Sequence, residues 1–200
     1  MPLFSHDGKS PKVDPSAYVA PTATLVGDVT VGPDARVMHG ASVVASAGAI
    51  TIGRGVIVLE NAVLRATETH DLVIGEACLI GPCAHAVGCT LEDEVFVATG
   101  SAVFHGAHLE SGSEVRVHGV VHVGSRLVAG STVPIGWVAV GDPAEVLPSG
   151  KHEQIWAIQE GLHFPKAAYG LEREDATMGA ITRRMAERLG RHRDDEEVAG

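Results

Sequence analysis

The sequence predicts a mainly β fold, a parallel β-helix built from six-residue repeats and followed by α-helices. Aliphatic residues recur at every sixth position over most of the chain, a small residue usually comes four positions after each, and glycine often follows the aliphatic directly. A period of six matches neither the 3.6-residue period of a helix nor the alternation of a hairpin sheet. It matches a triangular coil with one short strand and one turn on each side, with successive coils stacked at the strand spacing.

Residues 1–18 are expected to form an N-terminal arm, and residues 19–147 the β-helix. The inward aliphatic positions are expected to be Val19, Leu25, Val31, Val37, Val43, Ile52, Val58, Leu64, Ile74, Ile80, Ala86, Val97, Val103, Leu109, Val115, Val121, Leu127, Val133 and Ala139. The period is interrupted at 44–51 and 65–73, and both interruptions predict loops that protrude from the prism.

Residues 148–200 are expected to form a helical tail. A first helix is predicted over 151–162, beginning near Ser149 and ended by Phe164-Pro165. A second is predicted over 172–189, because apolar residues recur there at helical spacing, and this apolar face is expected to pack on the prism or on a neighbouring subunit. The charged segment 191–197 is expected to be disordered.

Composition narrows the function classes. The formal charge of −10 disfavours nucleic acid and anionic membranes as partners, and no apolar stretch has the length of a membrane span or the form of a signal peptide. The three cysteines are an odd number within twelve residues and do not resemble a disulfide framework. We therefore expect a cytoplasmic protein.

Several segments resemble the γ-class carbonic anhydrases. These are VMHGA at 37–41, LENAVL at 59–64, VGCT at 87–90 and GDPA at 141–144. The resemblance covers residues 10–150 and implies a left-handed β-helix, a homotrimer, and a catalytic zinc ion held by three histidines between subunits. The left-handed sense follows from the resemblance alone, since parallel crossovers are normally right-handed.

At the positions that the resemblance assigns to the three zinc ligands, this chain has Arg65, Pro82 and Val87. Arginine stays protonated and repels a cation, and proline and valine offer no donor. We therefore expect no zinc at that place and no other cofactor, and a zinc ion at another site is the alternative.

The catalytic residues of this protein are unknown from the sequence. The family's Arg-Gly-Asp corner corresponds to 45–47, with Ala45 and Ala47 in place of the charged residues, and its Gln-Asp pair corresponds to Leu59 and Glu60. Only Glu60 keeps the chemistry of the family at its position.

Other side chains offer alternatives. His105, His118 and His122 could form a displaced metal site, although imidazole spacing alone is weak evidence. The set Cys78, Cys83, His85 and Cys89 has the composition of a structural zinc site, but the cysteines are expected at separate places of the coil. His70, with Glu68 or Asp71 to orient it, is a candidate base for acyl transfer, because many hexapeptide β-helices are acyltransferases.

Arg65, Val87, Phe104 and His122 are expected to lie at a subunit interface. A homotrimer is expected from the resemblance and because a side that carries Val87 and Phe104 outward is too apolar to face water. Arg65 could pair with Glu60 of a neighbour and replace the metal as a bridge. Three functions remain: a scaffold or assembly subunit without carbon dioxide hydration, an enzyme with a repurposed pocket between subunits, or a divergent carbonic anhydrase. A further protein partner also remains open.

Overall fold

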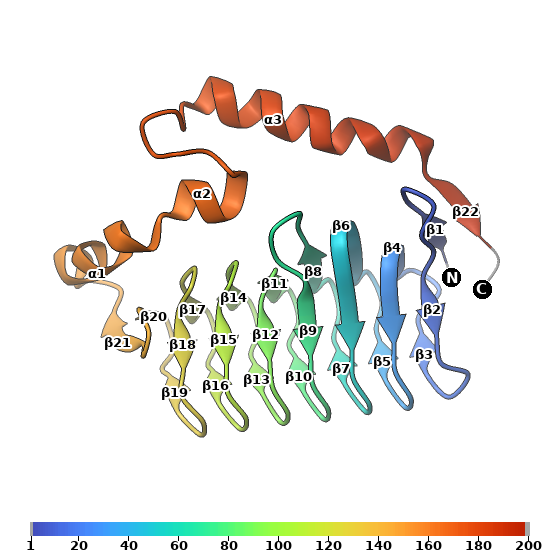
Figure 1. Ribbon diagram of the computed structural model, residues 1–200. Helices are drawn as coiled ribbons and strands as arrows, with labels where there is room; N and C mark the ends of the chain where they lie inside the picture. The colour runs from blue at the N-terminus through green and yellow to red at the C-terminus, as the bar shows by residue number, and fades with distance from the viewer. Residues whose placement is uncertain (1, 199–200) are drawn as a thin grey trace.

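A computed structural model describes residues 2–198 and has the chain wound as a left-handed parallel β-helix with α-helices along one side (Figure 1). The prism has three sides. The first side, called the helix-covered side below, contains β1 (Leu3–Ser5), the first part of β4 (Thr24–Val31), the first part of β6 (Ser42–Ile52), β8 (Val63–Ala66), β11 (His85–Val87), β14 (Ala102–Val103), β17 (Val120–Val121) and β20 (Trp137–Val140).

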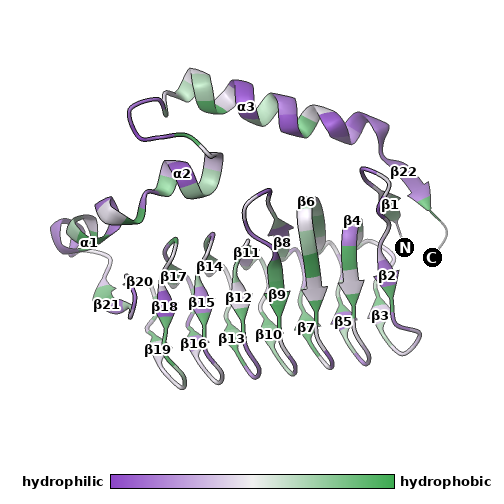
Figure 2. Cartoon of the chain, in the orientation of Figure 1, coloured by the Kyte–Doolittle hydropathy of each residue, from purple (hydrophilic) through white to green (hydrophobic). Residues whose placement is uncertain are grey.

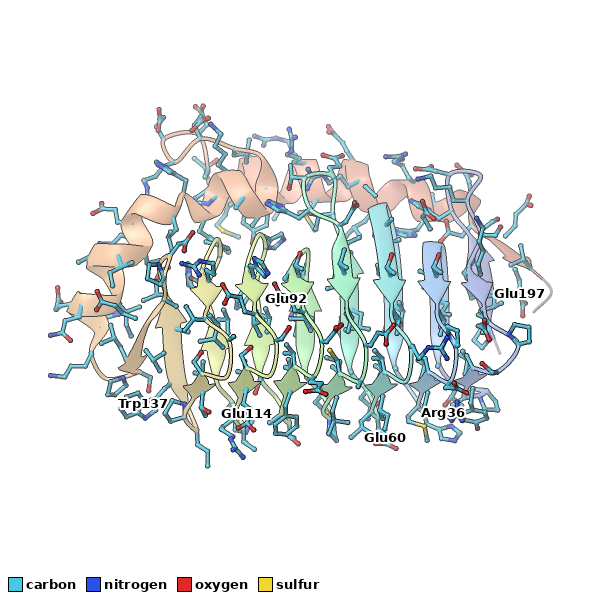
Figure 3. The ribbon with its side chains drawn as sticks, turned by 60° about the horizontal axis from the view of Figure 1, so that its bottom comes forward. Arg36, Glu60, Glu92, Glu114, Trp137 and Glu197 are labelled. Carbon is cyan, nitrogen blue, oxygen red and sulfur yellow. The ribbon has the colours of Figure 1, made fainter. Side chains whose placement is uncertain are left out.

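The remaining strands form the other two sides. The second side contains β2 (Lys12–Val13), the later parts of β4 and β6, β9 (Leu72–Ile74), β12 (Thr90–Leu91), β15 (His108–Leu109) and β18 (Arg126–Leu127). The third side contains β3 (Tyr18–Val19), β5 (Arg36–Val37), β7 (Ile57–Val58), β10 (Leu79–Ile80), β13 (Phe96–Val97), β16 (Glu114–Val115) and β19 (Thr132–Val133). Figure 3 turns this third side forward, with Arg36 near one end and Glu114 near the other.

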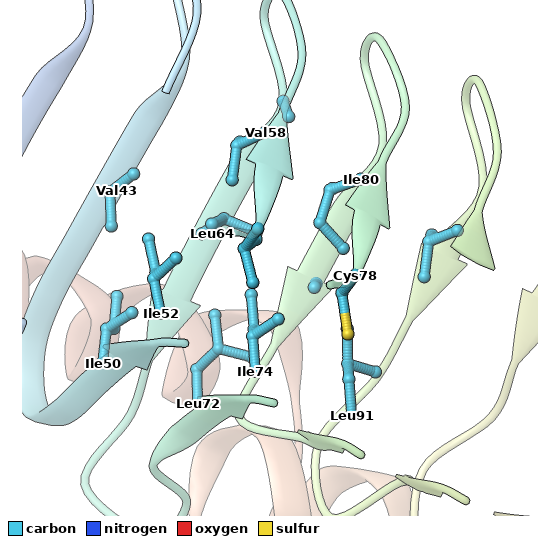
Figure 4. Packing of buried hydrophobic residues seen from close by; sticks show 14 of the residues in the cluster. Val43, Ile50, Ile52, Val58, Leu64, Leu72, Ile74, Cys78, Ile80 and Leu91 are labelled. Carbon is cyan, nitrogen blue, oxygen red and sulfur yellow. The ribbon is translucent and has the colours of Figure 1, made fainter. Parts of the chain in front are cut away.

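The core is a set of aliphatic columns that run through the coils. Every inward position expected from the six-residue period is buried, which confirms the period as the signal for the fold. On the helix-covered side Leu25, Val43, Leu64 and Ala86 follow one another in register through four coils. Figure 4 shows Val43 and Leu64 with their neighbours in the interior. Because the parallel strands are stacked in register, the inward aliphatic residue of one coil contacts that of the next, and each coil buries its apolar residues against its neighbour.

The coils approach so closely at some corners that only glycine fits. A Cβ atom added to Gly53 would lie 2.4 Å from the carbonyl oxygen of Gly75 and 2.9 Å from that of Ile74. These atoms belong to the backbone of the next coil and cannot rotate away. The glycine that follows an inward aliphatic therefore has a packing role.

The prediction of a protruding loop over residues 44–51 is wrong. Residues 44–51 lie in β6, an eleven-residue strand that pairs first with β8 and then with β9 and so runs through the corner between two sides. The extra residues are absorbed by a register shift against β4 between Gly27 and Val29. The second interruption does leave a connection, between the end of β8 at Ala66 and the start of β9 at Leu72.

The N-terminal segment adds to the sheet of the prism. β1 pairs parallel with β4 through Leu3 and Leu25, and β2 pairs with the later part of the same strand. Part of the segment 1–18, which was expected to form an arm, therefore belongs to the first coil of the β-helix.

The helical tail is confirmed as helical, with different boundaries from those expected. α1 (His152–Gln159) continues as a 3-10 helix η1 (Glu160–Leu162), close to the first expected helix. Phe164-Pro165 does not end the helical region but begins α2 (Phe164–Tyr169), because proline is tolerated in a first turn, where its missing N–H has no partner to lose.

α3 (Met178–Gly190) starts later than the expected residue 172. Thr177 has extended backbone angles and its hydroxyl accepts a hydrogen bond from the Ala180 N–H at 3.2 Å, which makes it the N-cap. Polar and apolar residues alternate along α3, whereas the strands are mostly apolar (Figure 2). Met185 faces the prism, while Met178 is 70% exposed and does not.

Both ends of the β-helix carry an antiparallel strand. β21 (Glu145–Pro148) folds back on β20, and β22 (Glu196–Val198) pairs with β1. The expectation of disorder for 191–197 is therefore wrong, since this segment forms the 3-10 helix η2 (Arg191–Asp194) and then β22. None of the helices within residues 2–198 has the length and apolar content to cross a bilayer.

Candidate functional site: a pocket under the C-terminal helices

A cavity of about 230 Å³ lies between the helix-covered side and helices α2 and α3. Its floor comes from β6, β8, β11 and the turn after β14, and its roof from the two helices. The lining residues are Ser46, Ala47, Arg65, Ala66, Thr67, Glu68, His85, Val87, Phe104, His105, Phe164, Ala168, Tyr169, Met185, Arg188, Leu189 and Arg191. Apolar walls with a few polar groups are typical of small-ligand sites.

Two of the three positions expected for zinc ligands meet on the floor of this pocket. Arg65 and Val87 are partners across β8 and β11, while Pro82 lies in the turn between β10 and β11 and does not line the pocket. Arg65 donates from Nη2 to the Ser46 hydroxyl oxygen at 3.3 Å. A guanidinium with this partner and an isopropyl group offer no donor to zinc, so this pair does not fit the metal.

The other positions compared with the family site lie apart. Ala47 lines the pocket and Ala45 is buried, while Leu59 and Glu60 are in the turn after β7. Within residues 2–198 no ion pair joins Arg65 to Glu60. The bridge between subunits therefore stays a prediction.

The expected interface residues are covered by the chain's own helices. The His122 ring lies between those of Phe104 and Phe164, at centroid distances of 6.4 and 6.2 Å. Val87 is only 5% exposed in the single chain. Much of the apolar surface that the sequence left for a neighbour thus packs against α2 and α3.

The pocket histidines favour the neutral form. Burial, as the largest cause, and the nearby His70 and His85 together lower the pKa of His105 to about 4. Burial also lowers the pKa of His85, with Arg65 adding to the effect. Nε2 of His85 and Nδ1 of His105 are buried, and neither has a hydrogen-bond partner among the described residues. Two uncharged imidazoles with free nitrogens are thus available to a small polar ligand.

Within residues 2–198, His105, His118 and His122 do not come together as one metal site, and the same site formed between subunits stays a prediction. His105 lies edge-on to His70 at 6.2 Å, and His122 lies among aromatic rings. His118 is in a turn at another corner, with its ring under Gly100. The cysteines are also apart, with Cys78 and Cys89 buried and Cys83 exposed. Burial raises the pKa of Cys78 to about 11 and that of Cys89 to about 12.

His70 lacks the orienting carboxylate expected for an acyl-transfer base. Its Nδ1 is 2.8 Å from the Thr69 hydroxyl. Glu68 pairs with Arg188 of α3, and Asp71 accepts the Ala49 N–H at 2.8 Å. Both carboxylates hold backbone or helix in place and do not orient the imidazole.

A second cluster, which the sequence did not reveal, joins the two ends of the chain. His6, His192 and Asp195 bring their ligand atoms within 4.8 Å of one another. No local pattern predicts it, because its members are up to 189 residues apart.

Known proteins share both the sequence pattern and the fold. No protein-family model matches the chain. The mitochondrial gamma carbonic anhydrase 1 of Arabidopsis thaliana is 30% identical over 175 residues, which are 84% of this chain and 62% of that protein. The carnitine operon protein CaiE of Escherichia coli K12 is 29% identical over 126 residues, 63% of this chain and 64% of that protein. The chain thus spans less than two thirds of the length of these relatives.

A solved structure agrees in fold. The hexapeptide transferase family protein of Anaplasma phagocytophilum superposes with a TM-score of 0.53 at 28% identity, covering 94% of this chain and 96% of that one. The six-residue coils, their register and these similarities lead to one conclusion: the chain is a hexapeptide-repeat β-helix protein and a homologue of proteins named gamma carbonic anhydrase.

Proposed function

We propose that this protein is a homotrimeric γ-carbonic-anhydrase-like protein that does not hydrate carbon dioxide and acts as a scaffold or assembly subunit. The observation that supports it is the pairing of Arg65 with Val87 on the pocket floor, where the resemblance requires imidazoles. Zinc hydration chemistry needs three neutral ligands and an open position for water. A cationic guanidinium at that place raises the free energy of a bound dication.

The test is carbon dioxide hydration by the purified chain after exposure to Zn²⁺, Co²⁺ or Fe²⁺. The expected rate equals the uncatalysed rate, and a γ-class enzyme of known activity serves as the positive control. Hydration above background that a chelator abolishes would overturn the proposal. The variant Arg65→Ala is assayed in parallel, and it too is expected to stay inactive because Pro82 and Val87 remain.

The homotrimer is supported by an apolar column on the third side. Ile57, Leu79 and Phe96 are adjacent in register on successive coils and point outward. Ile57 is 38% exposed. The column is flanked in register by Arg36 and Glu114, and an apolar patch rimmed by polar residues is typical of an interface between copies.

Light scattering is expected to give three times the chain mass of 20.8 kDa. Phe96→Glu is expected to lower the mass, because the carboxylate would be buried without a partner. Thr132→Glu, an exposed position at the end of the same side, is the control and is expected to keep the trimer. A monomeric wild type would contradict the proposal.

A second candidate function is catalysis in the pocket itself, supported by the unpartnered nitrogens of His85 and His105. Neutral imidazoles beside Arg65 suit a small carboxylate or acyl substrate. Thermal-shift assays with short carboxylates and acyl-coenzyme A test it, with His105→Ala as the variant that removes a pocket nitrogen. A shift in the wild type that His105→Ala abolishes would favour this candidate over the scaffold. Cytoplasmic location stays a prediction, since one matched relative is mitochondrial.

A further inference from the structure

The two ends of the chain meet beside the first coils. The N-terminal hairpin closes through a bridge between His6 and Lys9, and β22 lies antiparallel to β1 with Ser5 opposite Glu196. Figure 1 shows both termini at the same end of the prism. This pairing places η2, with His192, directly beside His6.

Two imidazoles share one carboxylate at this junction. Nδ1 of His6 is 2.5 Å from Oδ1 of Asp195, and Nδ1 of His192 is 2.8 Å from Oδ2 of the same residue. The two rings are stacked, with centroids 4.2 Å apart and planes 22° apart. The Nδ1 atoms therefore point to the same place, and the carboxylate lies between them.

The far nitrogens of both rings are held by one residue. Nε2 of His6 lies 3.1 Å from the Ser46 carbonyl oxygen, and Nε2 of His192 lies 3.0 Å from the Ser46 hydroxyl. Histidines that ligate metals are held in this way, with the second nitrogen fixed by a backbone oxygen or a polar side chain. The cluster thus has supporting contacts as well as ligands.

The contact of His6 with the Ser46 carbonyl oxygen determines which ring nitrogen of His6 faces the Asp195 carboxylate without a hydrogen of its own. A carbonyl oxygen only accepts, so Nε2 of His6 carries the hydrogen, and in the neutral ring Nδ1 presents a lone pair. That lone pair faces a carboxylate oxygen at 2.5 Å. Two electron-rich atoms at this distance repel each other unless a proton lies between them, and a divalent ion bound by both atoms would replace that proton.

We propose that His6, His192 and Asp195 bind a divalent first-row transition-metal ion such as Zn²⁺ and so fasten the C-terminal end of the chain to the first coils. Two imidazoles and one carboxylate are a ligand set that such ions prefer, and water completes the coordination. His6 is 3% exposed and Asp195 is half-buried, so a metal here is shielded from bulk water. Arg191, which precedes His192 in the chain, is paired with Asp7.

This site uses none of the family's zinc positions, although Ser46 contacts both His192 and Arg65, and its test is separate from that of the proposed function. The protein is produced without a histidine tag, stripped with a chelator and titrated with Zn²⁺ by calorimetry and with Co²⁺ by absorbance. We expect one ion per chain and a rise in melting temperature on Zn²⁺ addition, because the ion binds only the folded junction. Metal bound here without hydration activity leaves the proposed function intact.

The variants His192→Ala and Asp195→Asn are expected to weaken Zn²⁺ binding by roughly tenfold or more and to remove the thermal shift. The matched controls are His152→Ala, an exposed histidine of α1, and Asp194→Asn, the exposed neighbour of the proposed ligand. Both controls should bind as the wild type does. No saturable binding by the wild type, or equal losses in the controls, would overturn the proposal.

Discussion

Replacement of Leu64 by alanine should strongly destabilise the β-helix. Leu64 is completely buried in β8, and its inward neighbours in the register are Val43 on one coil and Ala86 on the next. Leucine-to-alanine changes in cores cost about 2–5 kcal/mol, and the cost is larger where the surroundings cannot collapse into the space. Because Ala86 is too short to fill the cavity and each coil is fixed by its neighbours, we expect about 3–5 kcal/mol.

The assay is urea unfolding followed by circular dichroism at one protein concentration, with thermal melting as a second measure. The loss should lower the melting temperature by roughly 10 °C for a chain of this size. Val73→Ala is the control, since Val73 is 40% exposed on the second side and should change stability by less than about 0.5 kcal/mol. A Leu64→Ala change below about 1 kcal/mol, or one equal to that of the control, would refute the packing argument.

Three further predictions follow from the coils and the pocket. Gly53→Ala should lower the free energy of unfolding by about 1–3 kcal/mol because its Cβ meets the next coil's backbone, whereas Gly150→Ala, with open space around it, should be tolerated in the same urea assay. The pKa of His105 is lowered to about 4 in the folded chain, so the unfolded chain takes up the proton first as pH falls below 6.5. The free energy of unfolding should therefore decrease by roughly 2 kcal/mol between pH 6.5 and 5, and it should decrease less in His105→Asn. Equal losses in both proteins would contradict this. Glu68→Gln removes the ion pair with Arg188. Because both groups are partly exposed, the free energy of unfolding should change by less than about 1 kcal/mol, while proteolysis of α3 should become faster. Unchanged cleavage would show that the pair does not hold the helix.

The sequence predicted the β-helix well because its signal is local and repeated. Each inward aliphatic reports its own coil, so a shift at one place leaves the rest of the pattern intact. The exception was β6, where small residues such as Ala45 and Gly48 interrupt the period but still form an extended strand. The interruption of the six-residue period at 44–51 was interpreted as a loop, although these residues form an extended strand.

The candidate sites were less predictable because they depend on contacts between distant segments. The adjacency of Arg65 and Val87 follows from coil register and could be expected. The covering of that floor by α2 and α3 could not, since helical spacing gives an apolar face but not its partner. The meeting of His6 with Asp195 depends on the return of the chain end to β1, and no local pattern indicates that return.

The antiparallel strands at the two ends of the prism have a consequence for assembly. A parallel coil that ended bare would offer its N–H and C=O groups to the coil of another molecule, and such additions could continue into a filament. Here β21 and β22 occupy those edges on the helix-covered side, and β22 presents Glu196 and Glu197 beyond them. Growth along the axis is thereby discouraged, which leaves sideways contact as the open route for copies to associate.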